Sequence, residues 1–298
     1  GAQRVGVVSL GGGLRSYEID GRELLDGFPA GARPERGRGQ VLVPWPNRIK
    51  DGSYEFDGKQ MQLPLTEPEH GNAIHGLVRG ATWNAGPASD HVVMDCLLEP
   101  QAGYPFALAL SVEYSLSDSG LTVTTTARNV GPESCPYGCG QHPYLTLGTP
   151  KIDTLRLQVP GRVVISSDER GVPVSTGPVD GTAYDFRTSR AIGGTVLDNG
   201  FTDLERSADG RARVLLDDPD SGAGITLWVD ESYPFLMMFS GDPYPDLARR
   251  SIAVEPMTCP PNAFRTHDSV IVLEPGESTS STWGIEPRLA PLGGNDVE

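Results

Sequence analysis

Histidine, arginine and glutamate side chains occur in four short segments whose composition is otherwise that of turns and strand ends. These are residues 43–49 with Arg48, residues 72–76 with His75, residues 140–145 with His142, and residues 252–264 with Glu255. A histidine and a glutamate that meet in a fold can serve as general acid and general base, because their ordinary pKa values, about 6.5 and about 4.3, lie near neutrality. These residues are therefore the first candidates for chemistry.

Each candidate also has an ordinary structural interpretation. Arg48 could be a surface ion-pair partner, His75 a turn residue, and His142 a ring that precedes Pro143 where a strand stops. Taken singly, these interpretations are favoured, because most loop histidines and arginines have no special role.

Glu255 ends an apolar strand directly before Pro256. A carboxylate that faces a core is costly to desolvate unless it is paired or used. Strand alternation places Glu255 on the face opposite Ile252 and Val254, however, and that face could equally be the solvent side. Spacing alone leaves both interpretations open.

Other kinds of site find little support in the sequence. It contains neither a Gly-x-Ser-x-Gly elbow nor a phosphate-binding Gly-x-x-x-x-Gly-Lys-Ser/Thr loop, which argues against common hydrolases and NTPases. His70 and His75 are too irregularly spaced for a typical metal site, so we predict no metal. Four sparse cysteines suit reduced thiols, and Cys135 and Cys139 are at most a weak redox pair.

The elements that must position these residues are predicted to be β-strands. The chain has 37 Gly and 26 Pro in 298 residues, which leaves little room for long helices. Apolar residues alternate strictly over 106–116, and β-branched residues follow over 121–128, a pattern typical of a hairpin. Asp57-Gly58 joins a second hairpin, 54–56 with 59–63, through a turn that needs positive φ.

Further short apolar runs indicate more strands, separated by turn residues. They are 92–98, 155–159, 214–216, 225–229, 235–239, 252–255 and 270–273. Many short strands without helical patterns between them predict an all-β fold, a sandwich or barrel of antiparallel sheets. No repeat or linker divides the chain, so we predict a single domain over residues 1–298.

The charge balance limits the partners. A net charge of −15 would repel phosphate backbones and anionic lipid, so we expect no nucleic acid and no membrane. Neither a spanning apolar segment nor the order of a secretion signal is visible, and we expect a cytoplasmic protein. A monomer or a homodimer is expected.

Together the segments resemble the aldose 1-epimerase (galactose mutarotase) family, in family order and over nearly the whole chain. The matching motifs are Pro-Asn-Arg-Ile at 46–49, Asn-Ala-Ile-His-Gly at 72–76, His-Pro-Tyr at 142–144, Leu-Asp-x-x-Phe at 197–201, Glu-Pro at 255–256 and Pro-Gly-Glu at 275–277. The ordered set is specific, although any one motif could arise by chance.

The resemblance implies a large antiparallel β-sandwich of the galactose mutarotase type, with an open cleft that binds a small-molecule sugar. It also implies interconversion of the α and β anomers of an aldohexose without any cofactor. By resemblance, Glu255 is the general base and His142 the general acid, and the substrate is held by Arg48, His75, Asp198, Asn47 and Tyr144. We expect Glu255 to be ionised and His142 protonated near neutral pH.

Two alternatives stay open. A hexose-6-phosphate 1-epimerase would share the fold but need extra cations, and the basic patch upstream of the first motif consists of Arg33, Arg36 and Arg38. A non-catalytic carbohydrate-binding protein would need neither His142 nor Glu255. The aromatic residues Trp45, Trp83, Tyr144 and Phe201 could form a sugar platform or ordinary core. The sequence after Glu255 differs from the commonest ending in the family, which leaves the sugar open.

Overall fold

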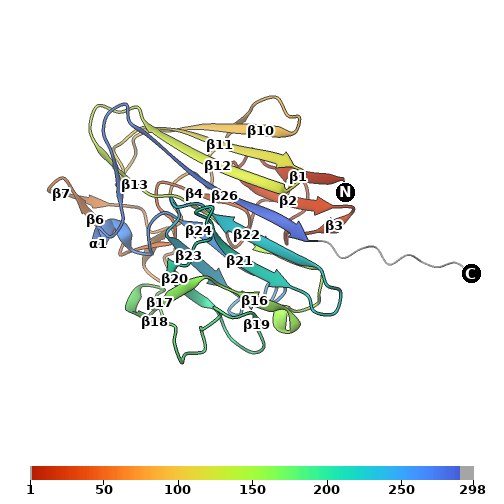
Figure 1. Cartoon of the computed structure of the whole chain (residues 1–298). Helices are drawn as coiled ribbons and strands as arrows, with labels where there is room; N and C mark the ends of the chain where they lie inside the picture. The colour runs from red at the N-terminus through yellow and green to blue at the C-terminus, as the bar shows by residue number, and fades with distance from the viewer. Residues whose placement is uncertain (1, 289–298) are drawn as a thin grey trace, which may run out of the picture.

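The computed structural model describes residues 2–288 and is built almost entirely of antiparallel strands (Figure 1). Strands hold 47% of the residues and helices 2%, which confirms the predicted all-β class. The helical pieces among the described residues are one turn of α-helix, α1 (Ala263–Thr266), and one of 3-10 helix, η1 (Ile152–Thr154). The single-domain prediction stays a prediction, and residues 1 and 289–298 of that range lie outside the described residues.

The larger sheet has nine strands. In spatial order they are β19 (Arg190–Ala191), β16 (Arg156–Gln158), β21 (Ala212–Asp217), β22 (Gly224–Val229), β26 (Ser278–Arg288), β12 (Gly120–Asn129), β11 (Leu108–Ser117), β10 (His91–Leu98) and β9 (Asn84–Ala85). The predicted hairpin is β11 and β12, whose register pairs Leu116 with Leu121.

The second sheet carries most of the candidate residues. Its strands, in spatial order, are β18 (Pro173–Pro178), β17 (Gly161–Ser167), β20 (Asp198–Leu204), β23 (Phe235–Phe239), β24 (Ile252–Met257), β14 (Gly140–Gln141) and β4 (Val41–Leu42), with β15 (Tyr144–Leu145) also paired to β24. Because β24 lies inside this sheet, its neighbours cover both of its edges.

Smaller strand groups flank the two sheets. They are β1 (Gln3–Val7), β2 (Leu14–Ile19) and β3 (Arg22–Glu23); β5 (Arg48–Lys50) with β8 (Asn72–Ile74); β6 (Ser53–Phe56) with β7 (Lys59–Gln62); and β13 (Cys135–Tyr137) with β25 (Ile271–Leu273). The second predicted hairpin is β6 and β7, and Asp57 between them has φ 49°.

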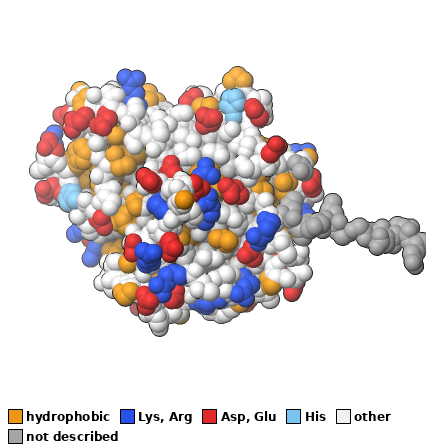
Figure 2. Space-filling view, viewed as in Figure 1, with side chains coloured by type: hydrophobic (Ala, Val, Ile, Leu, Met, Phe, Trp, Pro, Cys, Tyr) orange, Lys and Arg blue, Asp and Glu red, His pale blue; other side chains and the backbone are white. Residues whose placement is uncertain are grey.

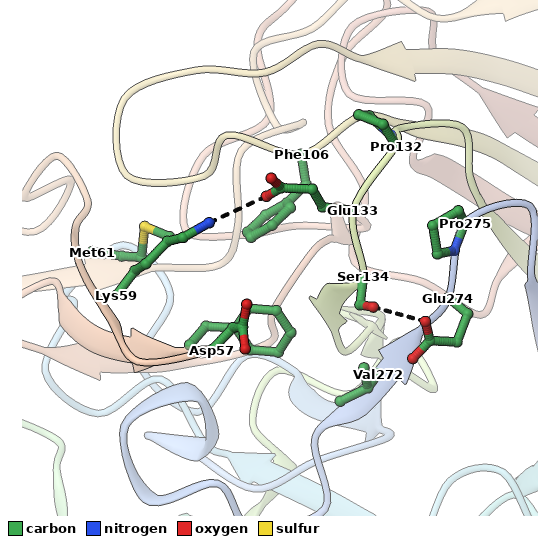
Figure 3. A pocket seen from close by; sticks show the side chains of 11 residues that line it. Asp57, Lys59, Met61, Phe106, Pro132, Glu133, Ser134, Val272, Glu274 and Pro275 are labelled. Atoms are coloured by element: carbon green, nitrogen blue, oxygen red, sulfur yellow. Dashed lines mark hydrogen bonds and ion pairs between the residues drawn. The ribbon is translucent and has the colours of Figure 1, made fainter.

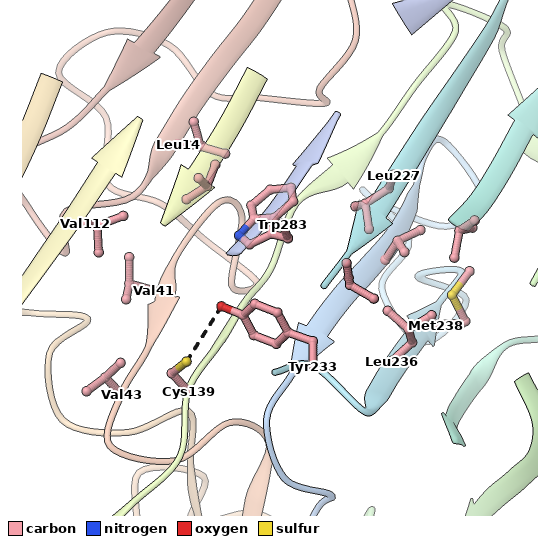
Figure 4. Close-up of a cluster of buried hydrophobic side chains, with 14 of the residues drawn as sticks. Leu14, Val41, Val43, Val112, Cys139, Leu227, Tyr233, Leu236, Met238 and Trp283 are labelled. Carbon is pink, nitrogen blue, oxygen red and sulfur yellow. Dashed lines mark hydrogen bonds between the residues drawn. The ribbon is translucent and has the colours of Figure 1, made fainter. Parts of the chain in front are cut away.

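The hydrophobic core lies between the two large sheets (Figure 4). Side chains from both sheets share one cluster, with Val112, Leu227 and Trp283 from the larger sheet and Leu236 and Met238 from the other. Such interdigitation is how two stacked sheets exclude water. The fold is therefore the predicted antiparallel β-sandwich.

One buried polar link joins the sheets through the core. The Trp283 indole N–H donates to Gln141 Oε1 at 3.2 Å, and Gln141 Nε2 donates to the Tyr114 hydroxyl at 2.9 Å. A buried amide needs such partners, since an unpaired one costs free energy. The Gln141 side chain is thereby fixed on the core side of its strand.

One prediction about strand ends needs correction. The strand that carries Glu255 does not stop before Pro256 but runs to Met257 as β24, with Pro256 opposite Leu236 of β23. Every residue of β24 is buried, so Glu255 does not face open solvent. Pro256 leaves one position of the ladder without a hydrogen bond, because proline has no backbone N–H.

Charged side chains of both signs are interspersed on the face shown in Figure 2, and no continuous basic surface appears there. None of the helices described in the structure is long and apolar enough to span a membrane.

Candidate active site

A cleft of about 380 Å³ opens against the second sheet and brings together all seven residues that the sequence assigned to a site. Those lining residues are Asn47, Arg48, His75, His142, Tyr144, Asp198 and Glu255. These residues come from distant parts of the chain, and the fold brings them together in one cleft. Whether each contacts a sugar stays a prediction.

Strand alternation explains why the two proposed catalytic side chains point into this cleft. Gln141 directs its side chain into the core, and the next residue, His142, faces the opposite way. On β23 and β24, Met238 packs in the core, whereas Met237 and its cross-strand partner Glu255 line the cleft. The cleft is therefore built on the sheet face that turns away from the core.

Arg48 and His75 reach the cleft from the small β5–β8 pair, in which Arg48 lies opposite Ile74. Asn47 has φ 54° and His75 has φ 60°, backbone conformations that are uncommon outside glycine. Reciprocal hydrogen bonds hold both residues: the His75 N–H donates to the Asn47 carbonyl at 2.8 Å, and the Asn47 N–H donates to His75 Nδ1 at 3.2 Å. Asn47 thus positions His75 through its backbone.

Because His75 Nδ1 accepts a hydrogen bond, the proton of its neutral ring is on Nε2. Burial lowers the pKa of His75 well below its ordinary value, and the nearby His142, Arg79 and Arg48 lower it further. His75 is therefore a neutral donor. Ligand atoms of His75, His142 and Glu255 lie within 4.8 Å of one another, a spacing that could hold a cation. In this tautomer, however, His75 Nε2 offers no lone pair, and its Nδ1 is already engaged.

His142 Nε2 lies 3.2 Å from Glu255 Oε1, and both side chains are buried at the base of the cleft. Burial lowers the pKa of His142 to about 3. It also raises the pKa of Glu255 well above its ordinary value, an effect to which the Asp198 carboxylate adds. Desolvation therefore favours a neutral pair, with a carboxylic acid at Glu255 and a neutral imidazole at His142, over the charged pair.

This charge state differs from the expected imidazolium–carboxylate pair. The physical reason is desolvation, which favours the neutral form of each group. The neutral pair and the charged pair hold the same number of protons. One proton can therefore pass between Glu255 and His142 along their contact. When two coupled groups titrate, the observed pKa values describe the pair and cannot be assigned to either residue alone.

Tyr144 and Gly37 both lie next to the His142 ring. Tyr144 stacks on it with ring centres 4.8 Å apart, and the Tyr144 hydroxyl donates to the Arg36 carbonyl at 2.7 Å. Gly37 also lies close to the ring, because an added Cβ there would stand 2.6 Å from His142 Cδ2. Tyr144 therefore orients the imidazole, and its hydroxyl is already occupied.

Comparisons with known proteins identify the family. The family model described as aldose 1-epimerase matches residues 2–286. The chain belongs to the aldose 1-epimerase family. It is 34% identical over 273 residues to "Uncharacterized protein YihR" of Escherichia coli (strain K12), covering 91% of this chain and 86% of that protein.

Two further similarities extend the comparison for this aldose 1-epimerase family member. The galactose mutarotase of Sus scrofa is 26% identical over 276 residues, covering 83% of this chain and 78% of that protein. A crystal structure of a GalM/aldose epimerase homologue from C. elegans superposes with a TM-score of 0.86 at 18% identity, covering 97% and 96% of the two chains, and supports the fold. Family membership supports a carbohydrate epimerase or mutarotase.

Several cleft residues of this family member escaped the sequence analysis. Phe239 and Tyr244 line the cleft, whereas Trp45, Trp83 and Phe201 are buried in the core. The alternation of β23, which puts Phe239 beside Met237 on one face, was the available signal. Of the proposed aromatic platform only Tyr144 belongs to the cleft.

The basic residues were also only partly anticipated. Arg36 lines the cleft, whereas Arg33 is not part of the lining. Arg38 is buried, and its Nη2 lies 3.8 Å from Asp26 Oδ2. Arg79, four residues after His75, lines the cleft and was not singled out. It forms no ion pair with any carboxylate in the part of the chain that the structure describes.

A larger cavity of about 620 Å³ lies elsewhere in this epimerase-family fold, between the β6–β7 hairpin and β25 (Figure 3). Its walls include Phe56, Met61 and Phe106, and its rim carries the Lys59–Glu133 pair at 3.4 Å. The described residues that line it include no histidine, and its Lys59–Glu133 pair is exposed. The smaller cleft is therefore the candidate active site.

Proposed function

We propose that this protein is an aldose 1-epimerase that interconverts the α and β anomers of a free aldohexose in the 380 Å³ cleft. The observation that carries the proposal is the 3.2 Å contact between His142 Nε2 and Glu255 Oε1 at the base of that cleft. Binding alone would not need a buried, proton-sharing pair, since burying it costs free energy. This argues against a purely carbohydrate-binding protein.

Anomer exchange needs one base and one acid near the anomeric carbon. The Glu255 carboxylate takes the O1 proton while the His142 imidazolium gives a proton to the ring oxygen. The C1–O5 bond breaks and the open-chain aldehyde forms. Rotation about C1–C2, followed by return of both protons, closes the ring as the other anomer.

The reactive charge state forms when the shared proton moves from Glu255 to His142. Positive charge on Arg48 lowers the pKa of Glu255 and so favours its carboxylate, against the larger effect of burial. Sugar hydroxyls that hydrogen-bond the cleft residues would further stabilise the charged pair. In this proposal Asp198, at the start of β20, accepts hydrogen bonds from the sugar hydroxyls, and His75 Nε2–H donates to them.

The test uses freshly dissolved single-anomer glucose and galactose, with anomer exchange followed by polarimetry or by NMR of the anomeric proton. We expect the protein to accelerate exchange above the buffer rate. The matched variant is Glu255→Gln, which keeps the side-chain shape and should lower kcat by about 10²–10⁴-fold, with sugar affinity within a few-fold. A variant that retained more than about a tenth of wild-type kcat would remove Glu255 from the mechanism.

A further inference from the structure

Arg48 is held by a carboxylate that no motif of the sequence includes. The Arg48 Nε–H donates to Glu67 Oε2 at 2.8 Å, and Nη2 donates to Glu67 Oε1 at 2.8 Å. This is the two-pronged geometry that matches a guanidinium to a carboxylate. Among the described residues the N–H groups of Nη1 have no hydrogen-bond acceptor, and because Arg48 lines the cleft they are available to a ligand there.

Glu67 is itself fixed from other directions. Asn72 Nδ2 donates to Glu67 Oε2 at 3.1 Å, and His70 Nδ1 lies 3.2 Å from Glu67 Oε1. The Glu67 side chain is only 8% exposed. Burial alone would raise its pKa, but the hydrogen bonds and charge of Arg48, together with hydrogen bonds from Asn72 and His70, outweigh that effect and the pKa is lowered. Glu67 is therefore ionised at neutral pH.

A turn of the second sheet also contacts the Arg48 guanidinium. Gly171, with φ 71°, lies against the Arg48 guanidinium, where any Cβ would collide with Nη1. Arg170 ties this loop to the Glu67 segment, because its Nε donates to the His70 carbonyl at 2.8 Å and its carbonyl accepts from Asn72 Nδ2 at 2.8 Å. Glu67 and Gly171 therefore restrict the orientation of the Arg48 guanidinium.

We infer that Glu67 is a positioning residue, which fixes the Arg48 guanidinium so that its free N–H groups meet the sugar. The inference rests on the proposed function. A long arginine side chain loses considerable conformational entropy when it is ordered, and Glu67 imposes that order before the ligand arrives. Glu67 also offsets the charge of Arg48, so that the pair is electrically neutral.

The experiment compares wild type with Glu67→Gln, Arg48→Met and the double variant, using the anomer-exchange assay. In Glu67→Gln an amide N–H faces the guanidinium, so the two-pronged pair is lost. We expect kcat/KM to fall about 10–100-fold, mainly through a higher KM, because a misplaced binding group acts on the substrate contact. In the Arg48→Met background, the same change should alter kcat/KM by less than about twofold, since residues that act as one unit are not additive.

Glu113→Gln serves as the control, because Glu113 is exposed on β11 and the substitution removes one negative charge outside the cleft. It should leave kcat/KM unchanged. A second readout needs no turnover: the Arg48 Nε–H should give a slowly exchanging ¹H–¹⁵N signal that disappears in Arg48→Met and loses its protection in Glu67→Gln.

Three results would overturn the inference: Glu67→Gln with wild-type kcat/KM, an equal loss in both backgrounds, or an unprotected Arg48 Nε–H in wild type. If the wild-type protein exchanged no aldose at all, the proposed function would fail and this inference with it. If wild type is active and Glu67→Gln matches it, only the role of Glu67 fails.

Discussion

Burial of the ionisable side chains of Glu255 and His142 costs free energy of folding. Two of their polar atoms, Glu255 Oε2 and His142 Nδ1, have no hydrogen-bond partner in the described structure. Such unsatisfied groups are rare in cores and cluster at functional sites, where activity is gained at the expense of stability. A substrate that supplies the missing partners would relieve this cost.

The raised pKa of Glu255 gives this cost a pH dependence. Above its ordinary pKa of about 4.3, the unfolded chain releases a proton that native Glu255 keeps. The free energy of unfolding therefore falls as pH rises from this ordinary pKa towards the pKa of Glu255 in the folded protein. We expect Glu255→Gln to raise Tm at pH 8 by about 2–4 °C, and this gain to vanish near pH 4.

Thermal unfolding at both pH values, with Glu113→Gln as the control for charge, measures this effect. A gain in Tm that was the same at pH 4 and pH 8 would show that the glutamine acts through packing, not through the buried proton.

At the scale of elements, the segment 37–40 determines where the His142 ring lies. The Gly39 N–H donates to the His142 carbonyl at 2.9 Å, and the His142 N–H donates to the Gln40 carbonyl at 3.1 Å. Arg38 is buried next to Asp26, which Arg250 and Ser251 also hold. With the hydrogen bond from the Tyr144 hydroxyl to the Arg36 carbonyl, these contacts hold the glycine-rich segment on both sides of Gly37.

Gly37→Ala tests this arrangement. The new Cβ would stand 2.6 Å from His142 Cδ2, so the imidazole or the backbone at residue 37 must shift and disturb the contact between His142 and Glu255. We expect kcat/KM to fall at least about tenfold, because catalytic contacts tolerate little displacement. Anomer exchange and urea unfolding of each variant measure activity and stability separately.

Gly31→Ala is the matched control, since Gly31 has a similar φ of 82° but no atom within 4 Å of the added Cβ. Both variants carry the same backbone strain, of about 1 kcal/mol or more. If Gly31→Ala lost as much activity as Gly37→Ala, backbone strain and not contact with His142 would be the cause.

At the scale of the whole molecule, charge bears on the substrate. The net charge of −15 repels a dianionic phosphate, and only local cations could reverse that. Of the cleft arginines, Arg48 is neutralised by Glu67, and Arg36 lies over the Tyr244 ring and 3.9 Å from Asp246. Arg79 is left as one cation without a carboxylate partner among the described residues, too few to cradle a phosphate.

We therefore expect a free aldose to have a higher kcat/KM than its 6-phosphate. Raising the salt concentration should narrow the difference, because screening weakens the repulsion. The measurement compares glucose with glucose 6-phosphate at two ionic strengths. A preference for the phosphate that weakened as salt rose would instead favour a hexose-6-phosphate 1-epimerase.

Much of this protein could be predicted from sequence because the signals are local. Strict alternation over 106–116 predicted β11, and Asp57-Gly58 predicted the β6–β7 turn, since both depend on neighbouring residues. The strand β26 was not predicted: its first half is serine and threonine, and contacts across the sheet, such as Thr126 with Ser280 at 2.8 Å, stabilise it.

Only the tertiary structure decided the environment of the site. The sequence could name Glu255 and His142 by resemblance, but not whether Glu255 faced solvent or a cleft, because alternation says only that it opposes Val254. The folded sheet buries both groups together, and that burial favours the neutral form of each group, whereas ordinary pKa values predicted two charges. Likewise Glu67 gained a role only when β5 and β8 came together, since pairing and desolvation depend on distance in space and not on distance along the chain.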